Sequence, residues 1–358
     1  MAADHARRVL LDAIAAGVFP SAVFDVGSST GPLQQGHLGR RTFARESAPV
    51  AAGTCYDLAS LTKPIATTTV VMDLVGRGTI GLDEPLAASF PEWHGADREP
   101  VTVRDLLEHS AGLPARLVDP PPPGRREFEH DICAMPLEYG PRTRSLYSDL
   151  GFILLGLLVE RRTTTLLDAT FDTVLQRLTS IDGTLATAPL SFRLDGDARL
   201  GAAPTRPLED DLRRGRMLAG EVHDNYAAML GGVAGHAGLF GTAAAVGGFA
   251  QLVLRAARGD GTVPPPLSPP QVAAMITQSA VPGSSRALGW DTMLPTSSCG
   301  TRMSAAAFGH VGFTGTSLWI DPLRDRYFVL LTNRACGDGT VEQMREVRRA
   351  FHDSLADL

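Results

Sequence analysis

The chain has 358 residues, of which 44% are hydrophobic and 20% are charged, and its formal net charge is −6. This composition supports one large folded domain or two moderate ones, and it excludes a globally disordered chain. A negative net charge also argues against a nucleic-acid-binding protein, which needs a basic patch.

The first 40 or so residues predict a helix followed by a pair of strands. Residues 5–17 have an amphipathic helical pattern that includes Asp12, which argues against a signal peptide. Two strands are predicted at 21–26 and 34–44, joined by a turn. No run of 18 apolar residues occurs, so we expect no membrane span. We therefore expect a cytoplasmic protein, or a periplasmic or secreted one if a leader segment was removed.

The segment 60–63, Ser-Leu-Thr-Lys, contains the only lysine of the sequence. Arginine stays protonated in any protein environment, whereas a buried lysine can lose its proton and act as a base. Residues 65–76 predict a buried helix that begins close to Ser60, with Pro64 in its first turn. Residues three apart share a helical face, so the Lys63 amine should lie near the Ser60 hydroxyl. Free N–H groups at a helix start favour a developing oxyanion.

The middle of the chain is mostly helical. Residues 101–107 predict a short helix that Thr102 and Asp105 cap. A proline-rich stretch at 119–124 predicts a surface loop, and residues 193–216 predict an exposed excursion. Longer helices are predicted at 150–160, 166–178 and 242–257.

The last quarter of the chain returns to strand patterns and ends in a helix. Strands are predicted at 287–293, 303–309, 316–320 and 326–332, and a helix at 340–356. This order predicts an α/β plus all-α fold, in which N- and C-terminal helices flank an antiparallel sheet and a helical domain is inserted. We place the sheet domain in 1–58 and 285–358, and the helical domain with the nucleophile in 59–284.

Neither the cysteines nor the histidines of the sequence predict a metal site. The four cysteines have no zinc-type spacing, so we expect free, buried thiols rather than a disulfide framework: Cys55, Cys133, Cys299 and Cys336. His223 precedes a glycine-rich run, 231–238, that contains His236, and the spacing of the two histidines fits no familiar ligand set. We expect no metal and no cofactor; a substrate-binding cleft edge and a purely structural role both remain open for these histidines.

Three short motifs occur in a fixed order: Ser60 to Lys63, then Tyr147-Ser148-Asp149, then His310-Val311-Gly312. With the flanking stretches 106–114 and 329–334, they resemble the serine β-lactamase and penicillin-binding protein superfamily. The resemblance spans residues 20–355. It is strongest to the class C β-lactamase-like branch, which includes D-alanyl-D-alanine peptidases and family VIII carboxylesterases, and it implies a β-lactamase/transpeptidase-like fold.

The resemblance implies a role for each matched position. Ser60 would attack the acyl carbon and form an acyl-enzyme. Lys63 would take or relay the hydroxyl proton, and Tyr147 would be the partner base that later protonates the leaving group. Which of these two side chains is the base stays open. The backbone N–H groups of Ser60 and Phe313 would form the oxyanion hole.

Two positions depart from the commonest family pattern. His310 replaces a lysine, and it would orient the Tyr147 hydroxyl or bind a substrate carboxylate. Asp149 replaces an asparagine, and together with Gly312 it would line the substrate site. A neutral histidine attracts a carboxylate less than an ammonium does, and Asp149 adds negative charge, so we expect poor β-lactam hydrolysis.

These observations predict a serine hydrolase that acts through an acyl-enzyme on a small ester or amide. Within that class we favour a carboxylesterase over a β-lactamase, with a D-alanyl-D-alanine carboxypeptidase between them. A catalytically inactive binding protein on the same fold is the alternative of a different class.

Overall fold

The computed structural model describes the chain except for residues 1, 118–119, 182–184, 186–187, 210 and 356–357. Within that part, six antiparallel strands form one sheet in the order β2-β1-β9-β8-β7-β6. The strands come from the two ends of the chain: β1 (Ser21–Ser28), β2 (Gly31–Gly39), β6 (Asp291–Thr292), β7 (Phe308–Val311), β8 (Ser317–Asp321) and β9 (Arg326–Thr332).

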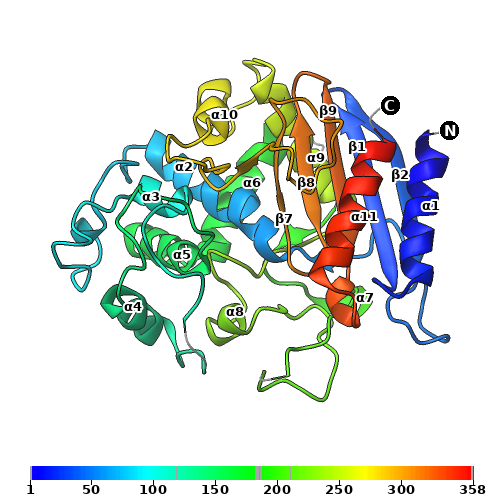
Figure 1. The fold of residues 1–358 in the computed structure, drawn as a ribbon, viewed down its shortest axis with the longest axis horizontal. Helices are drawn as coiled ribbons and strands as arrows, with labels where there is room; N and C mark the ends of the chain where they lie inside the picture. The colour runs from blue at the N-terminus through cyan, green and yellow to red at the C-terminus, as the bar shows by residue number, and fades with distance from the viewer. Residues whose placement is uncertain (1, 118–119, 182–184, 186–187, 210, 356–357) are drawn as a thin grey trace.

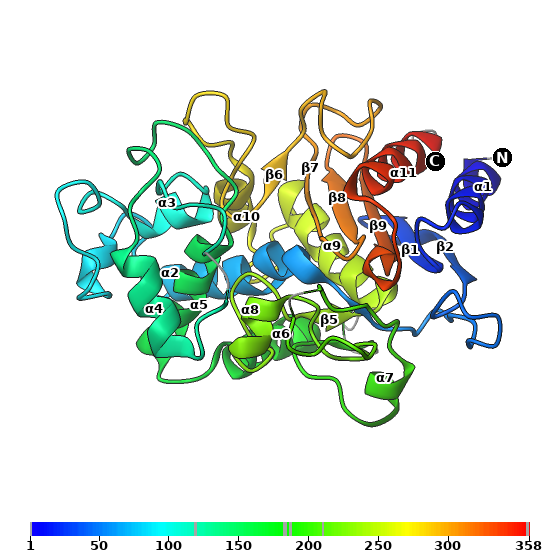
Figure 2. The same ribbon diagram turned by 60° about the horizontal axis from the view of Figure 1, so that its bottom comes forward.

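Helices cover both faces of this sheet (Figures 1 and 2). The first and last helices, α1 (Ala2–Ala15) and α11 (Val341–Ser354), pack against each other on one face, and α9 (Ala243–Ala257) packs on the other. Side chains of a strand alternate between faces, so Phe24 of β1 joins the core under α1 and α11 while Val23 joins the core on the α9 side. Strand β1 is therefore buried along its whole length.

The rest of the chain forms a mostly helical region beside the sheet (Figure 1). Its helices are α2 (Thr69–Gly76), α3 (Val103–Leu107), α4 (Arg125–Ala134), α5 (Asp149–Thr163), α6 (Leu167–Ile181), α7 (Gly196–Gly201), α8 (Asn225–Met229) and α10 (Pro269–Ile276). Helix α5 is buried on most of its surface, because α3, α4 and α6 pack around it. A second sheet joins β3 (Tyr56–Asp57), β5 (Phe240–Gly241) and β4 (Leu190–Ser191).

The predicted architecture is present, but several boundaries differ. Strand β2 ends at Gly39, whose φ of 81° turns the chain, and does not continue to residue 44. The segments predicted at 287–293 and 303–309 contribute only the short strands β6 and β7. Helix α4 was not predicted. The domain division at 59–284 stays a prediction, although α9 packs on the sheet.

Two further expectations can be compared with the structure. All four cysteines are free and buried, as predicted. Among the helices of the described residues, none has both the length and the apolar character that crossing a bilayer requires.

Candidate active site

The segment that carries Ser60 is held by a buried carboxylate just before it. Asp57 accepts hydrogen bonds from the backbone N–H groups of Ala59, at 2.8 Å, and His223, at 2.6 Å. It therefore holds the start of the Ser60 turn and also ties that turn to the 223 segment. Burial, only partly offset by these bonds, raises the pKa of Asp57 to about 6.

The helix predicted from Ser60 is not a regular α-helix. A 3₁₀ turn (η1, Ala59–Leu61) leads into a π-helical stretch (η2, Lys63–Thr68) and then into α2. Pro64, at the start of the π-helical stretch, has no N–H to donate to the preceding turn. Ala59 adopts a left-handed conformation with φ 48°, which is costly for a residue with a β-carbon.

Lys63 lies at the centre of the site and is fully buried. Its Nζ donates to Ser60 Oγ at 3.1 Å and to Tyr147 Oη at 2.6 Å. It also contacts Asp149 Oδ1 at 2.8 Å and the His236 carbonyl at 3.2 Å. The predicted proximity of the Lys63 amine and the Ser60 hydroxyl is confirmed, and the first two motifs meet at this amine.

The charge of Lys63 differs from the expectation of an uncharged amine. Burial alone would lower the pKa of Lys63, but the nearby Asp149 carboxylate and Tyr147 outweigh it and raise that pKa above its ordinary value of 10.5. Lys63 is therefore an ammonium at neutral pH. A neutral amine, which would let Lys63 itself act as the base, is contradicted, because the carboxylate beside Lys63 outweighs its burial.

Asp149 is itself compensated on its other side. Its Oδ2 lies 3.1 Å from Arg116 Nη1, and the same Nη1 lies 3.0 Å from Asp224 Oδ2. The Arg116 guanidinium also donates to Asn225 and lies 3.9 Å from the centroid of the Tyr226 ring. Although burial would raise it, the pKa of Asp149 is held below its ordinary value, chiefly by the Lys63 charge. Arg116 thus offsets the negative charge that Asp149 brings in place of an amide.

Tyr147 is surrounded by two histidines and an arginine. Its ring centroid lies 4.6 Å from that of His109 and 5.9 Å from that of His310, and the Arg286 Cζ lies 5.1 Å from it. His109 ends α3 with φ 55° and accepts a hydrogen bond from the Ser148 N–H through Nδ1. His109 therefore fixes the turn before Tyr147.

His310 brings the third motif to the same cavity. Burial, and then the Lys63 charge, hold the pKa of His310 well below its usual range, so the ring is neutral. Nδ1 lies 2.9 Å from the Val311 carbonyl and must donate its hydrogen there. Nε2 is then an acceptor, and it has no partner among the described residues. An acceptor can orient the Tyr147 hydroxyl but cannot hold a carboxylate, which favours the first of the two predicted roles.

Ser60, Tyr147, His310 and Phe313 line one cavity of about 300 Å³, which we call the inner cavity. Within the described part of the chain, the N–H of Phe313 makes no hydrogen bond. Arg348 Nη2 donates to the Gly312 carbonyl at 2.7 Å. Because C=O and N–H point in opposite directions across a trans peptide, this bond fixes the direction of the Phe313 N–H.

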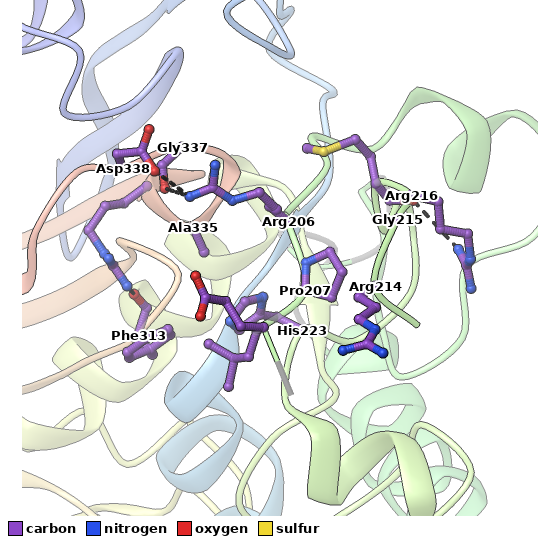
Figure 3. Close-up of a pocket in the computed structure, with 14 residues that line it drawn as sticks. Arg206, Pro207, Arg214, Gly215, Arg216, His223, Phe313, Ala335, Gly337 and Asp338 are labelled. Carbon is purple, nitrogen blue, oxygen red and sulfur yellow. Dashed lines mark hydrogen bonds and ion pairs between the residues drawn. The ribbon is translucent and has the colours of Figure 1, made fainter. Parts of the chain in front are cut away.

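The other predicted site residues lie at different depths. His223 stacks on Phe313, with ring centroids 5.4 Å apart, and lines a neighbouring cavity (Figure 3). Gly312 lines the inner cavity, and a β-carbon there would crowd the Leu58 carbonyl, so its lack of a side chain lets β7 approach the Ser60 segment. His236 is buried behind the cleft, where its Nε2 contacts Asp224 at 2.8 Å, so its ring does not reach the substrate space.

Sequence reasoning missed the arginines of the site, namely Arg116, Arg286, Arg334 and Arg348. With 33 Lys and Arg residues in the sequence and only one of them lysine, no local signal sets these four apart. In the part of the chain that the structure describes, no group of three or more His, Cys, Asp or Glu side chains is placed to hold a metal ion.

The sequence is similar to a family model and to curated proteins. A family model described as Beta-lactamase matches residues 11–352. An Escherichia coli (strain K12) protein described as "Putative D-alanyl-D-alanine carboxypeptidase" is 32% identical over 320 residues, covering 80% of this chain and 71% of that protein. The N-acetylmuramyl-L-alanine amidase of Bacillus subtilis (strain 168) is 30% identical over 314 residues, covering 81% of this chain and 70% of that protein.

Solved structures extend the comparison to the fold. EstCE1, described as a hydrolase with promiscuous acyltransferase activity, superposes with a TM-score of 0.76 at 20% identity, covering 99% of this chain and 98% of that one. The class C beta lactamase from Rhodobacter sphaeroides has a TM-score of 0.76 at 18% identity, covering 99% of both chains. Likeness at this level of identity shows a shared fold.

Proposed function

This chain belongs to the beta-lactamase family, and from that membership we propose that it is a carboxylesterase that acts through an acyl-enzyme on Ser60. The family resemblance, the β-lactamase/transpeptidase-like fold and the serine hydrolase class that the three motifs predicted are confirmed. The ester substrate and the roles of the individual residues are the proposal.

One observation carries the proposal: a single buried amine joins the Ser60 hydroxyl to the Tyr147 phenol, at 3.1 and 2.6 Å. A charged Lys63 cannot accept a proton, so the role of base falls to Tyr147: its deprotonated form, to which the ammonium donates, takes the Ser60 proton during attack. Tyr147 then donates the same proton to the departing alkoxide, and a water repeats the cycle on the acyl-enzyme. Backbone N–H groups of Ser60 and Phe313 stabilise the oxyanion.

Two features favour an ester over a β-lactam. The neutral His310 presents an acceptor to the inner cavity, where an ammonium would attract the carboxylate of a β-lactam. Asp149, predicted to line the substrate site, lines neither cavity: its two oxygens are engaged by Lys63 and Arg116, so it offers a β-lactam no hydrogen-bond donor in place of the usual amide. An ester without a charged group beside the scissile bond avoids both obstacles.

Arg286 favours a second candidate, a D-alanyl-D-alanine carboxypeptidase. Its guanidinium lines the inner cavity together with Ser60, and its nearest carboxylate, that of Asp291, is 3.7 Å away. A guanidinium in this position could bind the terminal carboxylate of a peptide. The description of the E. coli relative points in the same direction.

Mass spectrometry after incubation with p-nitrophenyl butyrate, nitrocefin and a D-alanyl-D-alanine peptide tests these candidates. We expect an acyl adduct on Ser60 from the ester, and its loss in Ser60→Ala. Lys63→Arg, which keeps the charge but not the compact ammonium, should lower kcat/KM by about a thousandfold, because a guanidinium cannot fit the space between the four acceptors around Lys63 Nζ. Turnover of the peptide alone would favour the second candidate. No adduct from any probe would favour an inactive binding protein.

A further inference from the structure

A larger cavity of about 740 Å³, which we call the outer cavity (Figure 3), shares lining residues with the inner one. Phe313 and Arg334 line both cavities, so the two meet at the proposed oxyanion position. The lining of the outer cavity combines apolar surface from Leu208 and Met217 with several guanidinium groups. No role described above uses this space.

The position of Tyr147 indicates which part of a substrate would enter the outer cavity. Tyr147 lines the inner cavity and is not among the residues that line the outer one. If Tyr147 protonates the leaving group, that group occupies the inner cavity. The acyl part must then extend away from Tyr147, past Phe313, into the outer cavity.

Two of the arginines around the outer cavity are already paired. Arg206 contacts Asp338 at 2.5 Å, and Arg216 contacts both carboxylate oxygens of Glu221, at 2.7 and 2.9 Å. Figure 3 shows the first of these pairs on one side of the cavity. These contacts compensate the charges of Arg206 and Arg216, so neither supplies a free cation.

Arg214 and Arg334, unlike Arg206 and Arg216, have no carboxylate partner among the described residues. Arg214 is exposed at the cavity, and within the described residues its side chain makes no hydrogen bond or ion pair. Arg334 donates to the carbonyls of Phe313 and Gly339 and has no carboxylate partner in the same part of the chain. The acids that line the outer cavity are Glu209 and Asp338, and Asp338 is paired with Arg206. The positive charges of Arg214 and Arg334 therefore face the single negative charge of Glu209.

His223 adds a buried hydrogen-bonding group to the same wall. The residue is 5% exposed, and neither ring nitrogen has a partner among the described residues. Burial lowers the pKa of His223 to about 4, so the ring is neutral and offers one N–H and one acceptor nitrogen. An unpartnered buried donor is costly, and a ligand acceptor in the cavity would satisfy it.

We propose that the outer cavity holds the acyl part of the substrate, and that Arg214 and the ring N–H of His223 bind an anionic group, such as a carboxylate, in that cavity beyond Phe313. The proposed substrates are half-esters of dicarboxylic acids, and other esters whose acyl group has a similar charge and length. This inference rests on the proposed function and makes it more specific.

Binding can be measured without turnover on the Ser60→Ala protein. Monomethyl adipate carries the anionic end and dimethyl adipate does not, and longer diacids up to sebacate extend the series. By calorimetry, we expect the half-ester of the best length to bind about tenfold tighter than its neutral diester, since a charge-assisted hydrogen bond replaces water. This preference should shrink between about 50 and 500 mM NaCl, because salt screens exposed charges.

Variants of the same protein identify the groups responsible. Arg214→Gln should reduce the preference to about twofold, and His223→Phe, which keeps a ring stacked on Phe313, should reduce it in part. Arg126→Gln removes the same charge from the exposed face of α4 and should leave the preference intact. Equal affinity of half-ester and diester at every length, no binding of any half-ester at millimolar concentration, or an undiminished preference in Arg214→Gln overturns the inference.

The proposed function has its own separate measurement. Wild-type protein from the same preparation is assayed with p-nitrophenyl butyrate, whose neutral acyl chain needs no anion site. Turnover of this ester with no half-ester preference leaves the proposed function standing and rejects the anion site. A preference for half-esters in binding, with no acylation of Ser60, leaves the anion site standing and rejects the proposed function.

Discussion

Replacing Asp149 with asparagine tests the charge assignment at the centre of the site. The Asp149→Asn change removes the carboxylate that lies 2.8 Å from Lys63 Nζ. At an effective dielectric constant of about 20, two unit charges at this distance attract each other by about 6 kcal/mol. Without this attraction, the burial that lowers the pKa of Lys63 is the dominant influence, so the amine should lose its proton at a lower pH than in the wild type.

The stability of the variant should depend on pH in a defined direction. Loss of one member of a buried pair costs about 3–5 kcal/mol when the other stays charged. In the wild type, the raised pKa of Lys63 gives stability that is lost only as pH rises through that pKa, so the contribution of Lys63 to stability does not change between pH 6 and 9. In the variant the folded chain releases the proton before the unfolded chain does, so stability rises with pH. Urea unfolding at pH 6 and 9 should show that the difference in the free energy of unfolding between the wild type and Asp149→Asn is smaller at pH 9.

The pH dependence of kcat/KM for p-nitrophenyl butyrate gives the second measurement. If the Lys63 ammonium stabilises a Tyr147 phenolate, Asp149→Asn should move the alkaline limb of the profile to lower pH. The exposed Asp12→Asn, on α1, should move neither limb. Higher activity of Asp149→Asn at neutral pH would refute the reasoning, because it would mean that a neutral Lys63 is the base.

Two predictions concern the scaffold. Burial raises the pKa of Asp25 to about 6, so wild-type stability should fall between pH 4 and 6 as the unfolded chain ionises first. Asp25→Asn should remove about 2 kcal/mol of the fall between pH 4.5 and 7, measured by urea unfolding at these two pH values, and an unchanged fall would contradict the assignment. A methyl group at Gly235 would overlap the Phe152 carbonyl, so Gly235→Ala should lower the free energy of unfolding by about 1–3 kcal/mol, measured by thermal unfolding. The control Gly201→Ala, with open space around the added methyl group, should lower it little. Equal melting temperatures of the two variants would reject this account.

Features with a local chemical cause were predictable from the sequence. Thr102 and Asp105 form the capping box of α3 because both partners lie within one helical turn. Helix α4 lacks such a signal: Gly124 at its start has no side chain to cap it. The early end of β2 depends on the left-handed conformation of Gly39, and the sequence pattern continues past it.

The composition of the site was predictable, but its electrostatics were not. Motif spacing identified Ser60, Lys63 and Tyr147, and in the structure the Lys63 amine lies within hydrogen-bonding distance of the other two side chains. The charge of that amine depends on Asp149, which is 86 residues away, and on Arg116, which compensates Asp149. Contacts of this kind arise from tertiary packing, so residue identity alone does not predict a protonation state.

The pairing of β1 with β9 has a consequence for biosynthesis. The two strands are hydrogen-bonded neighbours, yet Ala22 faces Thr332. The ribosome must therefore add roughly 300 residues after β1 before its neighbour exists, and such distant pairings fold slowly. The nucleophile emerges early in translation, whereas His310 emerges with the final strands. Until then the half-made sheet exposes an apolar edge, so we expect a dependence on chaperones during synthesis and no enzymatic activity from nascent chains.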